Sequence, residues 1–105
     1  MPLRILLADD HLIVRQGLKS LLEQENCTVV AEAGDGREAI QLAQKLHPDV
    51  AVLDLAMPLL NGLDAAREIA KVSPETRTIL LTMHTEDPYV VEALRAGVRD
   101  RKSVV

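Results

Sequence analysis

Short apolar runs alternate with longer amphipathic stretches along most of this 105-residue chain. The runs typical of β-strands are residues 4–8, 28–31, 49–54 and 78–82. Between them, apolar residues recur three or four positions apart, as on one face of an α-helix. These stripes are Val14, Leu18, Leu21 and Leu22; Ala39, Leu42, Ala43 and Leu46; Leu63, Ala66, Ile69 and Ala70; and Val90, Ala93 and Leu94. The alternation predicts an α/β fold, a doubly wound parallel sheet with helices on both faces.

Local signals indicate where the second helix begins and ends. Asp35, with Glu38 three residues later, has the spacing of a capping box and predicts a helix start. The pair His47-Pro48 predicts its end, because the residue before a proline resists the helical conformation. The run at residues 49–54 is apolar without alternation, which is typical of a strand buried on both faces. Gly62 is interpreted as part of the loop that follows this strand.

Composition excludes several function classes. No apolar run is long enough to span a membrane, and the start lacks a secretory signal, so we expect a cytoplasmic protein without membrane contact. The single cysteine, Cys27, excludes an internal disulfide and a cysteine cluster. A net charge of −4, one tyrosine and no other aromatic residue make this chain alone a poor nucleic-acid binder.

Polar side chains follow three of the predicted strands. Asp9 and Asp10 follow the first, Asp54 ends the third, and Thr82 ends the fourth. Ligands of doubly wound sheets bind at the carboxyl ends of the strands, where these side chains would converge. Three carboxylates at close range need a compensating positive charge. A hard divalent cation with oxygen ligands provides it, and Mg²⁺ is the expected ion.

Each of these residues also has an ordinary structural interpretation. Taken alone, Asp10 is equally well interpreted as a helix N-cap. Thr82 alone is more often a plain strand residue. The three histidines, His11, His47 and His84, are dispersed along the chain, and solvated or capping imidazoles are favoured over metal ligands.

Several motifs together resemble the receiver domain of two-component response regulators. They are Asp9-Asp10-His11, Asp54-Leu55-Ala56-Met57-Pro58, Asn61-Gly62-Leu63 and Leu80-Leu81-Thr82-Met83-His84. Residues 14–18 and 89–97 resemble more narrowly the branch with a C-terminal helix-turn-helix output domain of the NarL/FixJ/LuxR type. The resemblance covers residues 3–99 and implies a flavodoxin-like sheet with strand order 2-1-3-4-5.

The resemblance implies a role for each polar residue. Asp54 would be the phosphoacceptor that takes a phosphoryl group from the phosphohistidine of a sensor histidine kinase. Asp10 and Asp54 would ligate Mg²⁺ directly, Asp9 would do so through water, and the backbone carbonyl of Ala56 would add a ligand. Thr82 would bond a phosphoryl oxygen and act as the switch residue.

Ala56 and His84 stand at the variable positions that tune dephosphorylation in this family. After Arg99 the sequence departs from the family, whose members continue into a fifth strand and a fifth helix. Lys102 is the candidate for the phosphate-binding lysine, but it stands two residues too early, so the role is not transferred to it. Residues 100–105 match the translation of a common sequencing adapter. We therefore expect an incomplete receiver domain over residues 1–99 and a non-native tail over 100–105.

The expected function is that of a signalling domain that catalyses only its own phosphotransfer and dephosphorylation, and is otherwise not an enzyme. It would control a DNA-binding output domain outside this chain, and phosphorylation would allow a homodimer. One alternative is an aspartyl-phosphate hydrolase, which needs a second Asp where Ala56 stands. The other is a phosphorylation-independent interaction module. The displaced lysine favours this module, whereas Asp9, Asp10, Asp54 and Thr82 argue against it.

Overall fold

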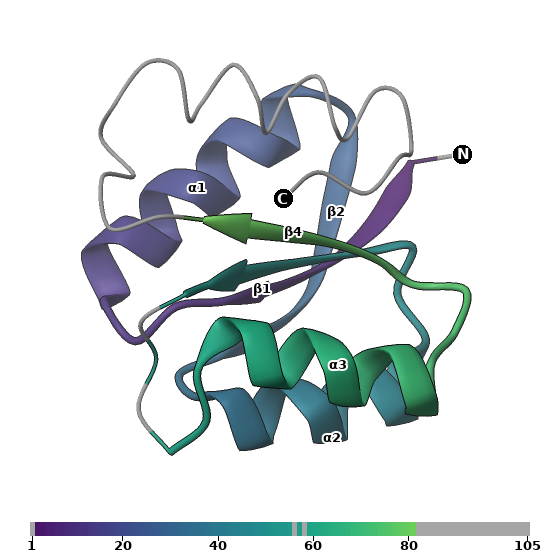
Figure 1. Ribbon diagram of the computed structural model, residues 1–105. Helices are drawn as coiled ribbons and strands as arrows, with labels where there is room; N and C mark the ends of the chain where they lie inside the picture. Colours follow the sequence, from purple (N-terminus) through teal and green to yellow (C-terminus); the bar gives the residue numbers. More distant parts are fainter. Residues whose placement is uncertain (1, 56, 58, 82–105) are drawn as a thin grey trace.

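The computed structural model describes residues 2–55, 57 and 59–81. In this part of the chain, four parallel strands form one sheet in the order β2-β1-β3-β4 (Figure 1). The strands are β1 (Leu3–Ala8), β2 (Cys27–Ala33), β3 (Val50–Asp54) and β4 (Arg77–Leu81), and the helices are α1 (Leu12–Gln24), α2 (Gly36–Leu46) and α3 (Gly62–Val72). The predicted doubly wound parallel sheet is confirmed. The helix predicted from Val90, Ala93 and Leu94 lies outside the described residues.

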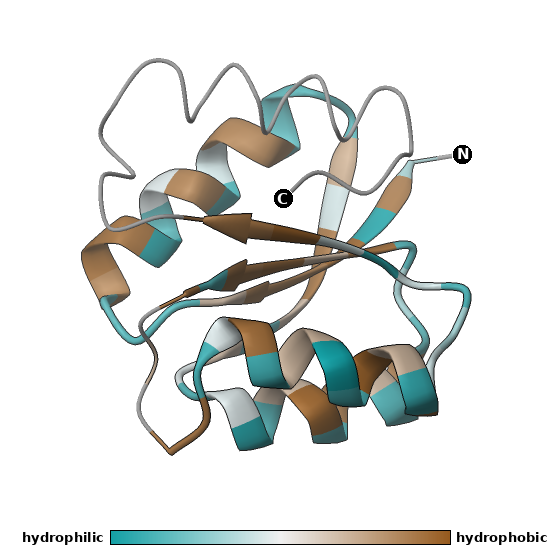
Figure 2. Cartoon of the chain, viewed as in Figure 1, coloured by the Kyte–Doolittle hydropathy of each residue, from teal (hydrophilic) through white to brown (hydrophobic). Residues whose placement is uncertain are grey.

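Helices cover both faces of the sheet, α1 on one and α2 with α3 on the other (Figure 1). Alternate strand residues therefore enter two different cores. On the α1 face, Ile5 and Leu7 of β1 join Leu18 and Leu22 of α1. On the opposite face, the core contains Leu6, Ala8, Ala39, Ala43, Ala51, Leu53, Ala65 and Ile69. Figure 2 shows the strands between the helices as a mostly apolar layer.

Strand β3 is the most deeply buried element, because all five of its residues are buried. Its neighbours in the sheet are β1 and β4. Val50 and Val52 enter the core under α1, and Ala51 and Leu53 enter the core under α2 and α3. The apolar run without alternation therefore corresponds to a strand covered on both faces, as predicted. This strand is a rigid support for Asp54, which ends it.

Strand β2 is longer than the predicted 28–31. It begins at Cys27 and ends at Ala33. Glu32 and Ala33 pair with the last two residues of β1, so the ladder extends the strand over residues with weak strand propensity. The register shifts between Ile5 and Leu6 of β1. The extension matters for the site because it carries β2 to the carboxyl edge of the sheet.

Helix α2 begins at its predicted cap, and one of the two contacts of the capping box has a different partner. The carboxylate of Asp35 accepts a hydrogen bond from the Glu38 amide at 2.8 Å. The Glu38 carboxylate accepts from the Gly34 amide, also at 2.8 Å, one residue before the cap. The helix ends at the predicted place, where His47 has a left-handed backbone (φ 46°) and its amide donates to the Ala43 carbonyl.

Gly62 is the first residue of α3, so the prediction that it belongs to the loop is wrong. Asn61 caps this helix. A Cβ on Gly62 would clash with the carbonyl oxygen of Asp54, and one on Gly36 would clash with that of Leu60. Two glycines thus allow backbone to contact backbone at both ends of the segment between β3 and α3.

We predict that Gly36→Ala lowers the free energy of unfolding by about 1–3 kcal/mol, because the new methyl group must displace the backbone of Leu60. The matched control is Gly17→Ala, in the exposed interior of α1, where a Cβ meets nothing within 4 Å. Alanine there should raise the free energy of unfolding by about 0.5–1 kcal/mol, through helix propensity. Urea denaturation of both variants checks this, and equal stabilisation by the two substitutions would contradict the packing argument.

Candidate functional site

The strand registers bring the predicted acidic residues to the same edge of the sheet. Ala8 of β1 lies opposite Leu53 of β3, so Asp9 leaves β1 beside Asp54. Asp54 in turn lies opposite Leu81, the last residue of β4. The convergence predicted from the strand ends is therefore present for the residues that the structure describes.

Four side chains form a compact acidic cluster at this edge: Asp9, Asp10, His11 and Asp54. One ligand atom from each lies within 4.8 Å of the others. Asp9 and Asp54 are buried, at 1% and 6% exposure, whereas Asp10 is exposed. The cluster therefore has two buried carboxylates and one on its solvent side.

His11 contacts both acids that precede it. Its amide donates to Oδ1 of Asp9 at 2.8 Å, and its Nδ1 lies 3.3 Å from the same oxygen and 3.0 Å from Oδ1 of Asp10. A ring nitrogen between two carboxylate oxygens carries its proton, so Nδ1 acts as a donor. His11 also occupies the N-cap position of α1, so the interpretation of Asp10 as the cap is wrong. In the sequence, the only sign that His11 contacts these acids is its position directly after Asp9 and Asp10.

The donor set of this cluster fits a hard divalent cation. Carboxylate oxygens from Asp9, Asp10 and Asp54 are the ligands that Mg²⁺ prefers. A cation among them would also offset the repulsion of three negative charges at close range. The other predicted site residues, Ala56, Thr82, His84 and Lys102, lie outside the described residues.

A second polar cluster lies at the opposite edge of the sheet, around His47. Its Nδ1 is 2.7 Å from Oε1 of Glu75 and 3.1 Å from Oγ of Ser73. A hydrolytic relay uses different ring nitrogens for the acid and the serine. The Ser73 hydroxyl also contacts Thr76 Oγ1, which donates to the Pro48 carbonyl. These contacts join two loops and have no catalytic arrangement.

Two titratable groups away from the acidic cluster have shifted pKa values, and each shift has a structural cause. A hydrogen bond from its own backbone lowers the pKa of the Glu75 carboxyl, and bonds from Ser73 and His47 lower it further. Burial, and then the nearby charge of Glu25, raises the pKa of the Cys27 thiol. A raised thiol pKa opposes nucleophilic chemistry at this cysteine.

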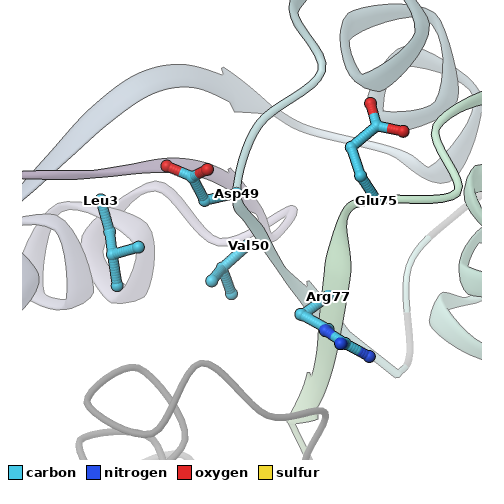
Figure 3. Close-up of a pocket in the computed structure, with 5 residues that line it drawn as sticks. All are labelled: Leu3, Asp49, Val50, Glu75 and Arg77. Carbon is cyan, nitrogen blue, oxygen red and sulfur yellow. The ribbon is translucent and has the colours of Figure 1, made fainter.

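A hollow of about 250 Å³ opens at the amino end of the sheet (Figure 3). Its lining residues are Leu3, Asp49, Val50, Glu75 and Arg77, from the starts of β1, β3 and β4 and from the preceding segments. Doubly wound folds bind ligands at the carboxyl ends of their strands. The acidic cluster, at that other end, is therefore the candidate functional site.

Comparison with known proteins agrees with the motifs and the fold. Residues 5–101 match the response regulator receiver domain family. The chain belongs to this family. The receiver-domain resemblance seen in the motifs is thereby confirmed, and the acidic cluster contains residues from two of the motifs that carried it.

Two curated relatives illustrate the similarity. The chain is 40% identical over 97 residues to the transcriptional regulatory protein YdfI of Bacillus subtilis, covering 91% of this chain and 45% of YdfI. It is 36% identical over 100 residues to the chemotaxis protein CheY of Thermotoga maritima, covering 95% of this chain and 83% of CheY. The chain thus spans less than half the length of YdfI.

A solved structure of a LuxR-family two-component response regulator from Aurantimonas sp. SI85-9A1 superposes with a TM-score of 0.85 at 31% identity. The match covers 99% of this chain and 90% of that one. Within the described residues, no helix has the length and apolar character needed to cross a membrane.

We predict that Asp10→Asn raises the free energy of unfolding by about 1 kcal/mol in metal-free, low-salt solution. The substitution removes one of three converging negative charges and keeps an oxygen that can accept from His11. Added salt should reduce the gain through screening. Glu68→Gln, at a half-exposed position of α3 whose surface ion pair with Lys71 contributes little, is the control for loss of one acidic charge. Chemical denaturation in EDTA measures both, and a destabilised Asp10→Asn variant would contradict the repulsion argument.

Proposed function

We propose that this receiver domain is phosphorylated on Asp54 by a sensor histidine kinase. The observation that supports the proposal best is the convergence of Asp54 with Asp9 and Asp10 at the carboxyl edge of the sheet. The buried β3 strand holds Asp54 at this edge, and the exposed Asp10 leaves the cluster open to solvent on one side. Family membership favours the same chemistry at the same motifs.

In the proposed reaction, a carboxylate oxygen of Asp54 attacks the phosphorus of a phosphohistidine. A phosphorus–oxygen bond forms, the phosphorus–nitrogen bond breaks, and its electron pair stays with the imidazole, which takes up a proton. The product on this chain is an aspartyl phosphate. Such transfers depend mainly on positioning and on offsetting charge.

The acidic cluster would hold Mg²⁺, with Asp10 and Asp54 as direct ligands, Asp9 acting through water, and the Ala56 carbonyl as a further ligand. When bound, Mg²⁺ supplies positive charge against the carboxylates and the phosphoryl oxygens. Asp9 is already oriented, since its Oδ1 accepts from the His11 amide at 2.8 Å. This contact suits a supporting role for Asp9.

Residues outside the described part have proposed roles as well. Thr82 would bond a phosphoryl oxygen and transmit the change in charge to the part of the chain that follows it. Ala56 and His84 would set the rate of dephosphorylation. A phosphoryl group adds up to about two negative charges, which is enough to bias a two-state element.

Exposed apolar side chains from two segments of the chain support docking of the kinase. Leu12 and Ile13 of α1 are 55% and 85% exposed, and Leu55, Leu59 and Leu63 follow β3. All five belong to segments that leave the carboxyl edge of the sheet. Apolar exposure next to an acidic site suits a protein partner that must bring its phosphohistidine to Asp54.

We further propose that the complete protein is a cytoplasmic transcriptional regulator with a DNA-binding output domain. YdfI, a transcriptional regulatory protein, is more than twice the length of its matched part. The structural relative from Aurantimonas is described as a member of the LuxR family. Phosphorylation would promote a homodimer that acts through the output domain.

We predict that incubation with acetyl phosphate and Mg²⁺ adds one phosphoryl group per chain, detected by intact mass. Asp54→Asn should abolish the gain, because the amide cannot act as the nucleophile. Asp64→Asn, at a half-exposed position of α3, should leave the gain unchanged. An unchanged gain in Asp54→Asn would mean that another residue is phosphorylated and would contradict the proposal. No gain in the folded, unsubstituted chain would also contradict it and would favour the phosphorylation-independent module.

A further inference from the structure

The side chain of Arg15, from the first turns of α1, lies across the carboxyl ends of β1 and β2. Its Nη1 donates to the carbonyl oxygen of Asp9 at 2.8 Å and is 3.3 Å from that of Ala33. Its Nε donates to Oε1 of Glu32 at 3.0 Å. One guanidinium therefore connects the last residues of β2 with the residue that follows β1.

These contacts hold the backbone of Asp9 from both sides. The Asp9 amide donates to the Ala33 carbonyl at 3.0 Å, and the Asp9 carbonyl accepts from Arg15. This carbonyl belongs to the peptide that joins Asp9 to Asp10. Arg15 therefore restrains the peptide from which both carboxylates of the acidic cluster extend.

The geometry of these contacts fits an arginine better than a lysine. The planar guanidinium can serve two carbonyls and a carboxylate at once, whereas a lysine ammonium is a point charge on a flexible stem. The Arg15 side chain is 19% exposed. A Cβ on Gly34 would lie 3.6 Å from Nη1, so the turn after β2 passes near the guanidinium.

We propose that Arg15 is a positioning residue, which fixes the Asp9–Asp10 peptide so that the two carboxylates keep the geometry needed to bind a divalent cation. The proposal rests on the proposed function of the acidic cluster. Arg15 acts through Asp9 and does not itself bind the ion. Outer groups that orient metal ligands typically change metal affinity by 10–100-fold when they are removed.

The structure offers a closely matched control for this effect. Lys19 lies on the same helix and its Nζ is 3.6 Å from Oε2 of Glu32, so it shares the carboxylate that Arg15 contacts. Lys19→Ala thus removes one positive charge from the same neighbourhood. Arg15→Lys keeps the charge but loses the fork of donors, and it separates positioning from electrostatics.

The test measures Mg²⁺ binding by calorimetry, and amide exchange of His11 by NMR, in the full chain and in both variants. The His11 amide reports directly on Asp9, because it donates to Oδ1 of that residue. We expect Arg15→Lys to weaken Mg²⁺ binding at least about tenfold and to speed exchange of the His11 amide. Lys19→Ala should change neither value by more than about twofold, since its ion pair is at the surface.

The outcomes separate this proposal from the proposed function. If Arg15→Lys binds Mg²⁺ as tightly as the unsubstituted chain does, the positioning role of Arg15 is overturned. The proposed Mg²⁺ site itself is then unaffected. Failure of the natural chain itself to bind Mg²⁺ would overturn the proposed function. In that case the exchange rate of the His11 amide still tests the role of Arg15. An exchange rate in Arg15→Lys equal to that of the unsubstituted chain would overturn this role.

Discussion

Parallel pairing of β1 with β3 places Asp9 beside Asp54, with Asp10 one residue further along the chain. Carboxylates at such distances repel each other, and the repulsion grows as water is excluded from buried acids such as Asp9 and Asp54. The surrounding groups respond to this charge. His11 directs its amide and Nδ1 at the acids. The remaining negative charge makes this edge of the sheet suited to a cation and, with it, to phosphoryl chemistry.

The position of Asp54 is then determined by the burial of β3 and by close backbone contacts of the segment that follows it. The strand is buried along its whole length, so its position is set by both cores. Gly62 allows α3 to begin against the carbonyl of Asp54, and Gly36 allows α2 to begin against Leu60. The segment between β3 and α3 is thus held at both ends by contacts that a side chain would prevent. A precise site needs such support from packed elements.

The sequence predicted the features that depend on local pattern. The buried run before Asp54, the acids after the first strand and the cap at Asp35 were all readable from neighbouring residues, and the family resemblance followed from them. It did not predict Gly62 as a helix start, because that depends on contact with Asp54 across the loop. The contacts of Arg15 with β2 could not be predicted either, because Glu32 and Ala33 are 17 and 18 positions away in the sequence. The role of Asp54 as phosphoacceptor stays a prediction.

We expect Asp54 to accept a phosphoryl group in a site that Mg²⁺ completes. Fluorine NMR with beryllofluoride, an analogue of the phosphoryl group, tests it directly in the natural chain and in Asp54→Asn. A phosphoryl site of this kind should give a bound fluorine signal that requires Mg²⁺ and Asp54 together. A bound signal that persists without Mg²⁺, or in Asp54→Asn, would contradict it.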